Sequence, residues 1–149
     1  MCIRDSGSWM VSVTEDPLTD EFNLFMANQH DYNNALAVRY RDNMLEVFLA
    51  TDFLGDDSDV HFKKVLYRFD KRNLIEDYWG MGMKNKSLFF YGNDADTLAE
   101  FIEKMMIYNQ VAIGYWPHNE KRKTIVYDLN GFIAAISPYL DEIGLEHLK

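Results

Sequence analysis

The clearest pattern in the sequence is a period-two alternation of apolar and polar positions on both sides of Asp42-Asn43. Such alternation is typical of strands with one buried face. Asp and Asn tolerate the positive φ that a two-residue hairpin turn needs, so the pattern predicts an antiparallel hairpin. Its apolar side consists of Leu36, Val38 and Tyr40, then Leu45, Val47 and Leu49.

Shorter strand-like runs are bounded by turn residues along most of the chain. They cover residues 9–13, 22–28, 60–70, 74–78, 87–91, 111–116 and 124–129. In the run 60–70, Val65, Tyr67 and Phe69 share one side.

Two segments have the helical period of 3.6 instead of two. The first spans about residues 94–108, with Asn93 or Asp94 as the expected N-cap, and the second spans about residues 131–144. Because few helices separate the strands, the sheet should be mainly antiparallel. The sequence therefore predicts an α+β fold, with a mainly antiparallel sheet or sandwich and two helical regions.

The length of 149 residues is that of one domain, which we place at residues 9–149. Residues 1–6, Met-Cys-Ile-Arg-Asp-Ser, resemble a translated adapter remnant of sequence assembly. They have neither a strand pattern nor the apolar stretch of a signal peptide. We therefore expect residues 1–8 to be an artefact or disordered, and the true N-terminus to be missing.

Composition narrows the classes of partner. The net charge of −9 argues against nucleic acid, whose binding depends on neutralising phosphates. No apolar run approaches the ~18 residues of a membrane helix, so we expect a soluble chain. The net charge of −9 without a basic face also favours a monomeric or weakly associated chain. Cys2 is the single cysteine, which excludes an intrachain disulfide.

Sequence motifs of known chemistry are absent: there is no serine-hydrolase elbow, P-loop, HExxH or dinucleotide fingerprint. Asp56, Asp57, Asp59 and His61 could ligate a cation, but a solvated turn explains them better, because the EF-hand order is missing. We therefore expect no metal, no cofactor and no catalytic residue. Three strand carboxylates could serve acid–base chemistry, but ion pairs with Arg39 or Arg68 are the favoured explanation: Asp70, Asp77 and Asp128.

The two strand-borne arginines are the candidate binding residues. Alternation sends Arg39 and Arg68 to the more polar face of the sheet. Each arginine can pair with a carboxylate such as Glu46, Asp70 or Asp77, which is the favoured hypothesis. The alternative is a shallow recognition surface formed with Trp79, since Arg and Trp anchor many interfaces. The candidate binding set is Arg39, Arg68, Asp70 and Trp79.

Several segments, in order, resemble the TagO/VasI family, which includes proteins associated with type VI secretion and phage or orphan bacterial relatives. The matching segments are Trp9, Val11, Asp16-Pro17 and Asp20; Leu36 to Tyr40; Val65 to Asp70; Trp79; Phe101 to Met105; Tyr115 to Pro117; and Tyr127 to Gly131. Together they span about residues 9–145.

The resemblance implies a non-catalytic accessory or binding domain of the bacterial cell envelope or of type VI secretion, or a phage-encoded relative. It also implies a protein or envelope partner and a periplasmic or secreted location. Two cysteines of the family are missing here, where Tyr40 and the region of Ile143-Gly144 stand, which weakens the case for an oxidising compartment. The alternative is an uncharacterised hydrolase that uses Asp70, Asp128 or the acidic loop.

Overall fold

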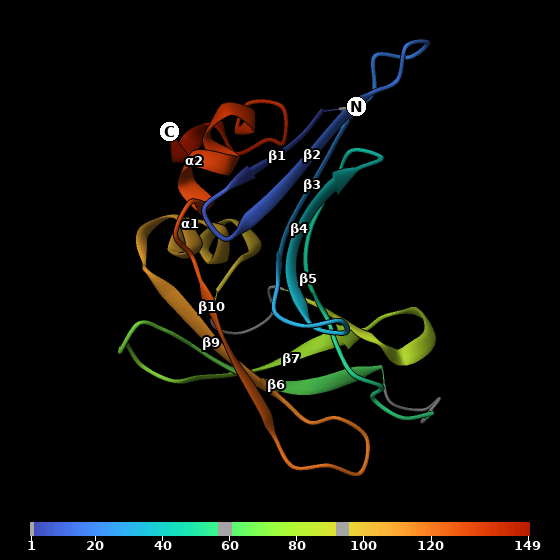
Figure 1. Cartoon of the computed structure of the whole chain (residues 1–149), viewed down its shortest axis with the longest axis vertical. Helices are drawn as coiled ribbons and strands as arrows, with labels where there is room; N and C mark the ends of the chain where they lie inside the picture. The colour runs from blue at the N-terminus through green and yellow to red at the C-terminus, as the bar shows by residue number, and fades with distance from the viewer. Residues whose placement is uncertain (1, 57–60, 92–95) are drawn as a thin grey trace.

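A single antiparallel sheet makes up most of the molecule (Figure 1). The computed structural model describes residues 2–56, 61–91 and 96–149, with backbone alone at residues 2–6. Within these ranges ten strands pair in the order β1-β2-β3-β4-β5-β8-β7-β6-β9-β10. Their bounds are β1 Cys2–Ser6, β2 Trp9–Glu15, β3 Phe22–Gln29, β4 Ala35–Arg41, β5 Met44–Ala50, β6 Phe62–Phe69, β7 Ile75–Met81, β8 Ser87–Phe89, β9 Gln110–Tyr115 and β10 Lys123–Asp128.

Two short α-helices accompany the sheet, α1 at Leu98–Ile107 and α2 at Phe132–Ile136. Three 3₁₀ turns complete the regular structure, at Met83–Asn85, Ser137–Tyr139 and Glu146–Leu148. The predicted α+β class, the antiparallel sheet and the two helical regions are confirmed.

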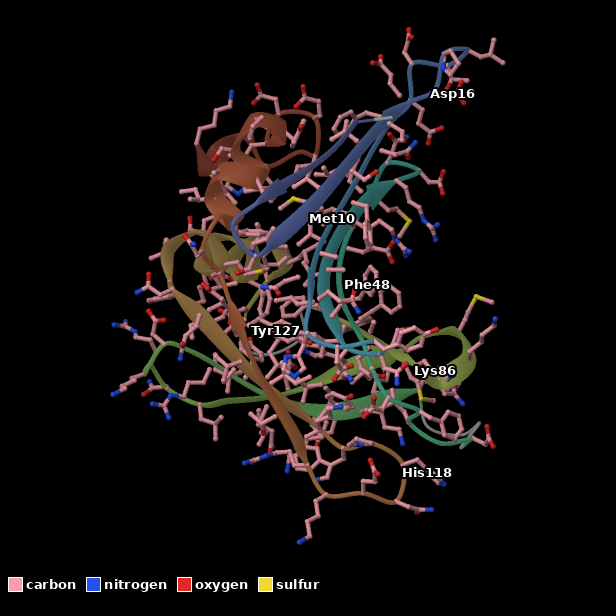
Figure 2. All side chains as sticks on the ribbon, viewed as in Figure 1. Met10, Asp16, Phe48, Lys86, His118 and Tyr127 are labelled. Carbon is pink, nitrogen blue, oxygen red and sulfur yellow. The ribbon has the colours of Figure 1, made fainter. Side chains whose placement is uncertain are left out.

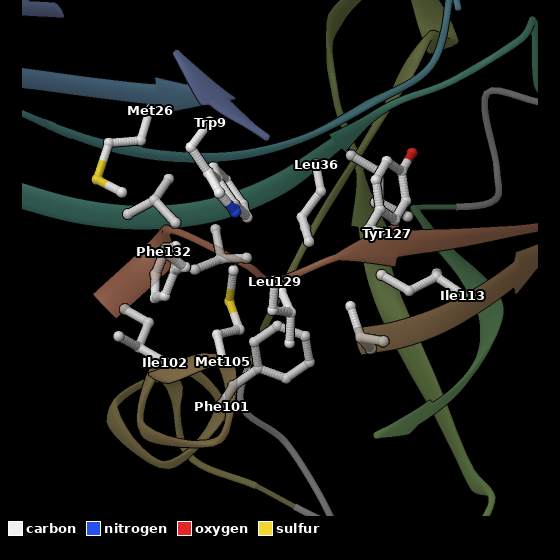
Figure 3. Packing of buried hydrophobic residues seen from close by; sticks show 14 of the residues in the cluster. Trp9, Met26, Leu36, Phe101, Ile102, Met105, Ile113, Tyr127, Leu129 and Phe132 are labelled. Atoms are coloured by element: carbon white, nitrogen blue, oxygen red, sulfur yellow. The ribbon is translucent and has the colours of Figure 1, made fainter. Parts of the chain in front are cut away.

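The sheet is strongly curved, and its two halves face each other across the core (Figure 1). Asn28 of β3 bridges the halves, because its Nδ2 donates to the backbone oxygen of Asp128 in β10 at 2.7 Å. Figure 3 shows core side chains from both halves and from the helices packed together: Trp9, Met26 and Leu36 approach Phe101, Met105, Phe132 and Tyr127. The concave face of the sheet is therefore the buried one.

The hairpin between β4 and β5 has the geometry that its sequence predicts. Asp42 and Asn43 have φ values of 52° and 61°, the left-handed pair that a two-residue turn requires. Val38 and Val47 are opposite each other and fully buried.

Helix α1 starts later than predicted. Thr97 is its N-cap and forms a capping box with Glu100, so the predicted cap at Asn93 or Asp94 is wrong. Asn93 and Asp94 themselves lie outside the described residues. Asp96 turns into the core, where it accepts a hydrogen bond from the Tyr67 hydroxyl at 2.7 Å and pairs with Lys104 at 2.8 Å.

The expectation that residues 1–6 form no strand is also wrong. Residues Cys2–Ser6 form β1, which pairs antiparallel with β2 after a turn at Gly7, whose φ is +58°. The edge of a sheet offers unpaired N–H and C=O groups to any extended segment that a tight turn brings alongside, whatever its side chains. The origin of this segment stays a prediction.

Candidate functional site

Three phenylalanines and an arginine form a row on the convex face of the sheet, which we call the outer row: Phe25 of β3, Arg39 of β4, Phe48 of β5 and Phe89 of β8. Directly opposite residues share a face, and the register pairs Phe25 with Arg39 and Phe48 with Phe89. Each member is partly exposed. Figure 2 shows Phe48 on the side of β5 turned away from the helices.

The members of the outer row are in contact with one another. The rings of Phe48 and Phe89 are stacked, with centroids 5.0 Å apart and an interplanar angle of 26°. The centroid of the Phe25 ring lies 6.5 Å from that of Phe48. The Arg39 guanidinium carbon lies 5.0 Å from the Phe48 centroid and 5.8 Å from that of Phe89. Cation–π contacts of this kind contribute about 0.5–1 kcal/mol at exposed sites.

Glu46 holds Arg39 in place over the rings. Arg39 Nη2 lies 2.8 Å from Glu46 Oε1 and Nε lies 3.2 Å from the same oxygen. The two residues are directly opposite each other on β4 and β5. The predicted cross-strand ion pair is therefore confirmed for Arg39, and it presents a fixed planar cation within an apolar row.

A polar hollow adjoins one end of the outer row. It has a volume of about 410 Å³ and extends over the outer face of β2, β3 and β4. Phe25 and Arg39 line it together with Ser12, Thr14, Asn23 and Arg41. The outer row thus has hydrogen-bonding groups at its border, as protein interfaces usually do.

The four candidate binding residues do not form one surface. Trp79 is 0% exposed and packs against Tyr67 and Phe101, so we correct its assignment from binding residue to core residue. Arg68 is exposed on β6, and β5, β8 and β7 lie between its strand and that of Arg39. No ion pair of Arg68 is present within residues 2–56, 61–91 and 96–149, so the predicted pairing does not extend to it.

The strand carboxylates are also dispersed. Asp70 accepts hydrogen bonds from the backbone N–H groups of Asn109 and Gln110 at 3.1 and 3.0 Å, and so fixes the start of β9. Asp128 accepts from the N–H of Asn130 at 2.8 Å. Asp77 is buried and accepts from the N–H of Tyr78 at 2.8 Å. These carboxylates bind local backbone instead of converging on a cleft.

The proposed cation loop is only partly described, because Asp57 and Asp59 lie outside the described residues. Among the residues that the structure describes, no group of three or more His, Cys, Asp or Glu side chains is arranged to hold a metal ion. Within the same residues, no helix is long and apolar enough to cross a membrane.

A polar network that the sequence did not reveal lies where the two halves of the sheet meet. The side chain of Asn34 is fully buried, and its Nδ2 donates to Asp31 Oδ1 at 2.9 Å and to Asp52 Oδ1 at 3.0 Å. The Tyr115 hydroxyl donates to Asn34 Oδ1 and accepts from the Asp52 N–H at 2.9 Å. Lys123 Nζ lies 3.0 Å from Asp52 Oδ2 and 3.5 Å from Asp31 Oδ2.

The network shifts the titration of its members. Hydrogen bonds from the Asn34 side chain and the Asn33 backbone lower the pKa of Asp31 from 3.8 to about 2. The hydrogen bond to Asp52 raises the pKa of Lys123, and burial raises the pKa of Tyr115. Asp31, Lys123 and Tyr115 therefore keep their ordinary charges near neutral pH, which suits a structural clamp and not proton transfer.

No family model matches the chain, and no curated protein matches its sequence. Among solved structures, the crystal structure of invasion associated protein B from Bartonella henselae is similar, with a TM-score of 0.64. The match covers 95% of this chain and 97% of the other at 15% sequence identity. A likeness at this identity establishes a shared fold over nearly the whole length of both chains.

Proposed function

We propose that this chain is a non-catalytic binding module that recognises a protein partner through the outer row. The observation that carries the proposal is the row itself: Phe48 contacts both Phe25 and Phe89 on the convex face, and the Arg39 guanidinium lies over the rings of Phe48 and Phe89. Aromatic residues, phenylalanine among them, and arginine are enriched in protein interfaces relative to the rest of the surface. Singly scattered surface rings would need no such explanation.

The arrangement of the carboxylates favours binding over catalysis. A hydrolase needs an acid and a base at a defined separation around a substrate, whereas Asp70, Asp77 and Asp128 each accept hydrogen bonds from local backbone. Among the described residues these carboxylates do not converge on a cleft, which favours the binding module over the hydrolase; Asp57 and Asp59 of the acidic loop lie outside those residues.

The bacterial cell envelope, or a surface reached by secretion, is the setting that we propose for the partner. The support is the resemblance of the sequence to the TagO/VasI family, together with a fold shared with a protein named for its association with invasion. An association with type VI secretion and an origin in a phage are narrower forms of the same proposal.

The proposal can be tested by retention of envelope proteins on the immobilised chain. The wild type is compared with a Phe48→Ser, Phe89→Ser double variant in an extract of bacterial envelope. Val126→Ser is the matched control, because Val126 is an apolar residue, 54% exposed, on β10 and away from the outer row. We expect a partner that the wild type and the control retain and the double variant loses. Equal retention by all three would reject the outer row as the interface.

A further inference from the structure

Two lysines point to the inner face of the sheet, and they differ in whether their ammonium groups form ion pairs. Lys123 is opposite the buried Tyr115, and its ammonium pairs with Asp52 and Asp31. Lys63 is opposite the buried Trp79, on the same side of β6 as Val65 and Tyr67, so it also points inward. Within the described residues, Lys63 makes no ion pair or hydrogen bond through its ammonium.

An inward lysine without a partner breaks the alternation rule that the rest of β6 obeys. Violations of this kind are expected at functional sites. β6 lies between β7 and β9, but its pairing with β9 ends at Leu66, so the side of β6 toward β9 is open at Lys63.

Lys63 borders an open pocket of about 460 Å³, a size common for small-molecule sites, which span roughly 300–1,000 Å³. The pairing of β6 with β9 ends at Leu66 and Gly114, and beyond this point the pocket lies between the two strands. The floor of the pocket is formed by the buried residues Leu54, Leu88 and Tyr115. Its rim carries the two lysines, Lys63 and Lys64, and the indole of Trp116.

The walls of the pocket are held in place by contacts outside it. The N–H of Leu54 donates to the backbone oxygen of Asn85 at 2.8 Å. The N–H of His118 donates to the backbone oxygen of Phe53 at 2.9 Å, which joins the loop after β5 to the β9–β10 hairpin. Lys64 is already paired with Glu76 at 2.9 Å and stands 5.4 Å from the Trp116 ring. Lys63 is thus the cation left for a ligand.

We infer that this pocket binds an amphiphilic monoanion, an apolar body that carries one acidic head group, such as a fatty carboxylate. The apolar body lies on Leu54, Leu88 and Tyr115, and the carboxylate pairs with Lys63. In a chain with 24 acidic and 15 basic side chains, a pocket rimmed by two lysines is complementary to a negative ligand and repels a positive one. This site is separate from the outer row and does not depend on the function proposed for it.

The test is a titration of the whole chain with decanoate, followed by calorimetry and by tryptophan emission. Trp9 and Trp79 are buried, whereas Trp116 is 37% exposed on the pocket rim, so Trp116 should report occupancy by a blue shift. Decanol supplies the apolar body without the charge, and acetate supplies the charge without the body. Both should bind roughly tenfold or more weakly than decanoate.

Variants locate the binding. Lys63→Met keeps the length of the side chain and should weaken decanoate roughly tenfold to hundredfold, while Lys63→Arg keeps binding. Lys71→Gln, in an exposed turn, is the charge control and should bind as the wild type does. The Phe48→Ser, Phe89→Ser variant should also bind decanoate normally, which separates this site from the outer row.

Three results would overturn the inference: no binding of decanoate by the wild type, equal binding of decanol, or unchanged binding by Lys63→Met. Because the Lys63 ammonium makes no ion pair or hydrogen bond within the described residues, and methionine keeps the length of the side chain, Lys63→Met should melt no lower than the wild type, so that loss of binding cannot be attributed to unfolding.

Discussion

Replacing Asn34 by alanine removes the centre of the polar network that joins the two halves of the sheet. The variant loses the donors to Asp31 and Asp52, at 2.9 and 3.0 Å, and the acceptor of the Tyr115 hydroxyl. The hydroxyl belongs to a residue that is 2% exposed, so water cannot readily replace the lost partner.

The expected loss of stability follows from these contacts. A buried polar group left without a partner costs about 1–3 kcal/mol. The Asp52 carboxylate is partly exposed, so the hydrogen bond lost to it contributes about 0.5–1 kcal/mol after solvent screening. The hydrogen bond lost to the exposed Asp31 acts in the same direction. The free energy of unfolding should therefore fall by about 3 kcal/mol, which for a chain of this size lowers Tm by roughly 6–12 °C.

Thermal unfolding at pH 7, followed by circular dichroism, measures this change. Asn33→Ala is the control, because Asn33 is exposed and contributes only its backbone N–H to Asp31. We expect the control to melt within about 2 °C of the wild type, as surface substitutions usually do. If Asn34→Ala also melts within that range, the network does not hold the two halves together.

Three further predictions concern the same charges and the core. The pKa of Asp31 is lowered from 3.8 to about 2, so its contribution to stability is present above pH 3.8 and is lost as the pH falls toward 2. In Asn34→Ala, which lacks the main cause of this shift, Tm should therefore fall less steeply between pH 3.8 and pH 2 than in the wild type. Lys123→Met should lower the free energy of unfolding by up to about 1 kcal/mol in a urea titration, since it removes the partly exposed ion pair with Asp52. Phe101→Ala should cost about 3–5 kcal/mol in the same titration, because the ring is fully buried against Tyr67 and Trp79; a smaller loss than that of Lys123→Met would contradict the packing.

Local patterns were sufficient to predict most of the strands. The hairpin around Asp42-Asn43 was predictable because alternation and turn residues lie within a few positions of each other. The start of α1 was not, because Thr97 and Glu100 outcompete Asn93 and Asp94 as a cap. The pairing of β1 depends on an exposed edge and not on its own side chains.

The candidate sites depended on contacts that the sequence does not show. Arg39 could be predicted as a surface residue because its strand alternates clearly. The same alternation places Phe48 of the next strand on the outer face, so part of the outer row could have been predicted as well. Trp79 was misassigned because a tryptophan in a strand gives no sign of which half of a curved sheet will cover it. Asp31, one partner of Asn34, is three positions away, but the other two, Asp52 and Tyr115, lie 18 and 81 positions away, so no local pattern could join them.

If the outer row is the surface that meets a protein partner, site-specific photocrosslinking from within the row should capture that partner. A benzoylphenylalanine at position 48 is compared with one at position 126, each irradiated in the same envelope extract and analysed by mass spectrometry. We predict one discrete crosslinked protein from position 48 and none from position 126. Crosslinks to the same protein from both positions, or none from position 48, would contradict the claim.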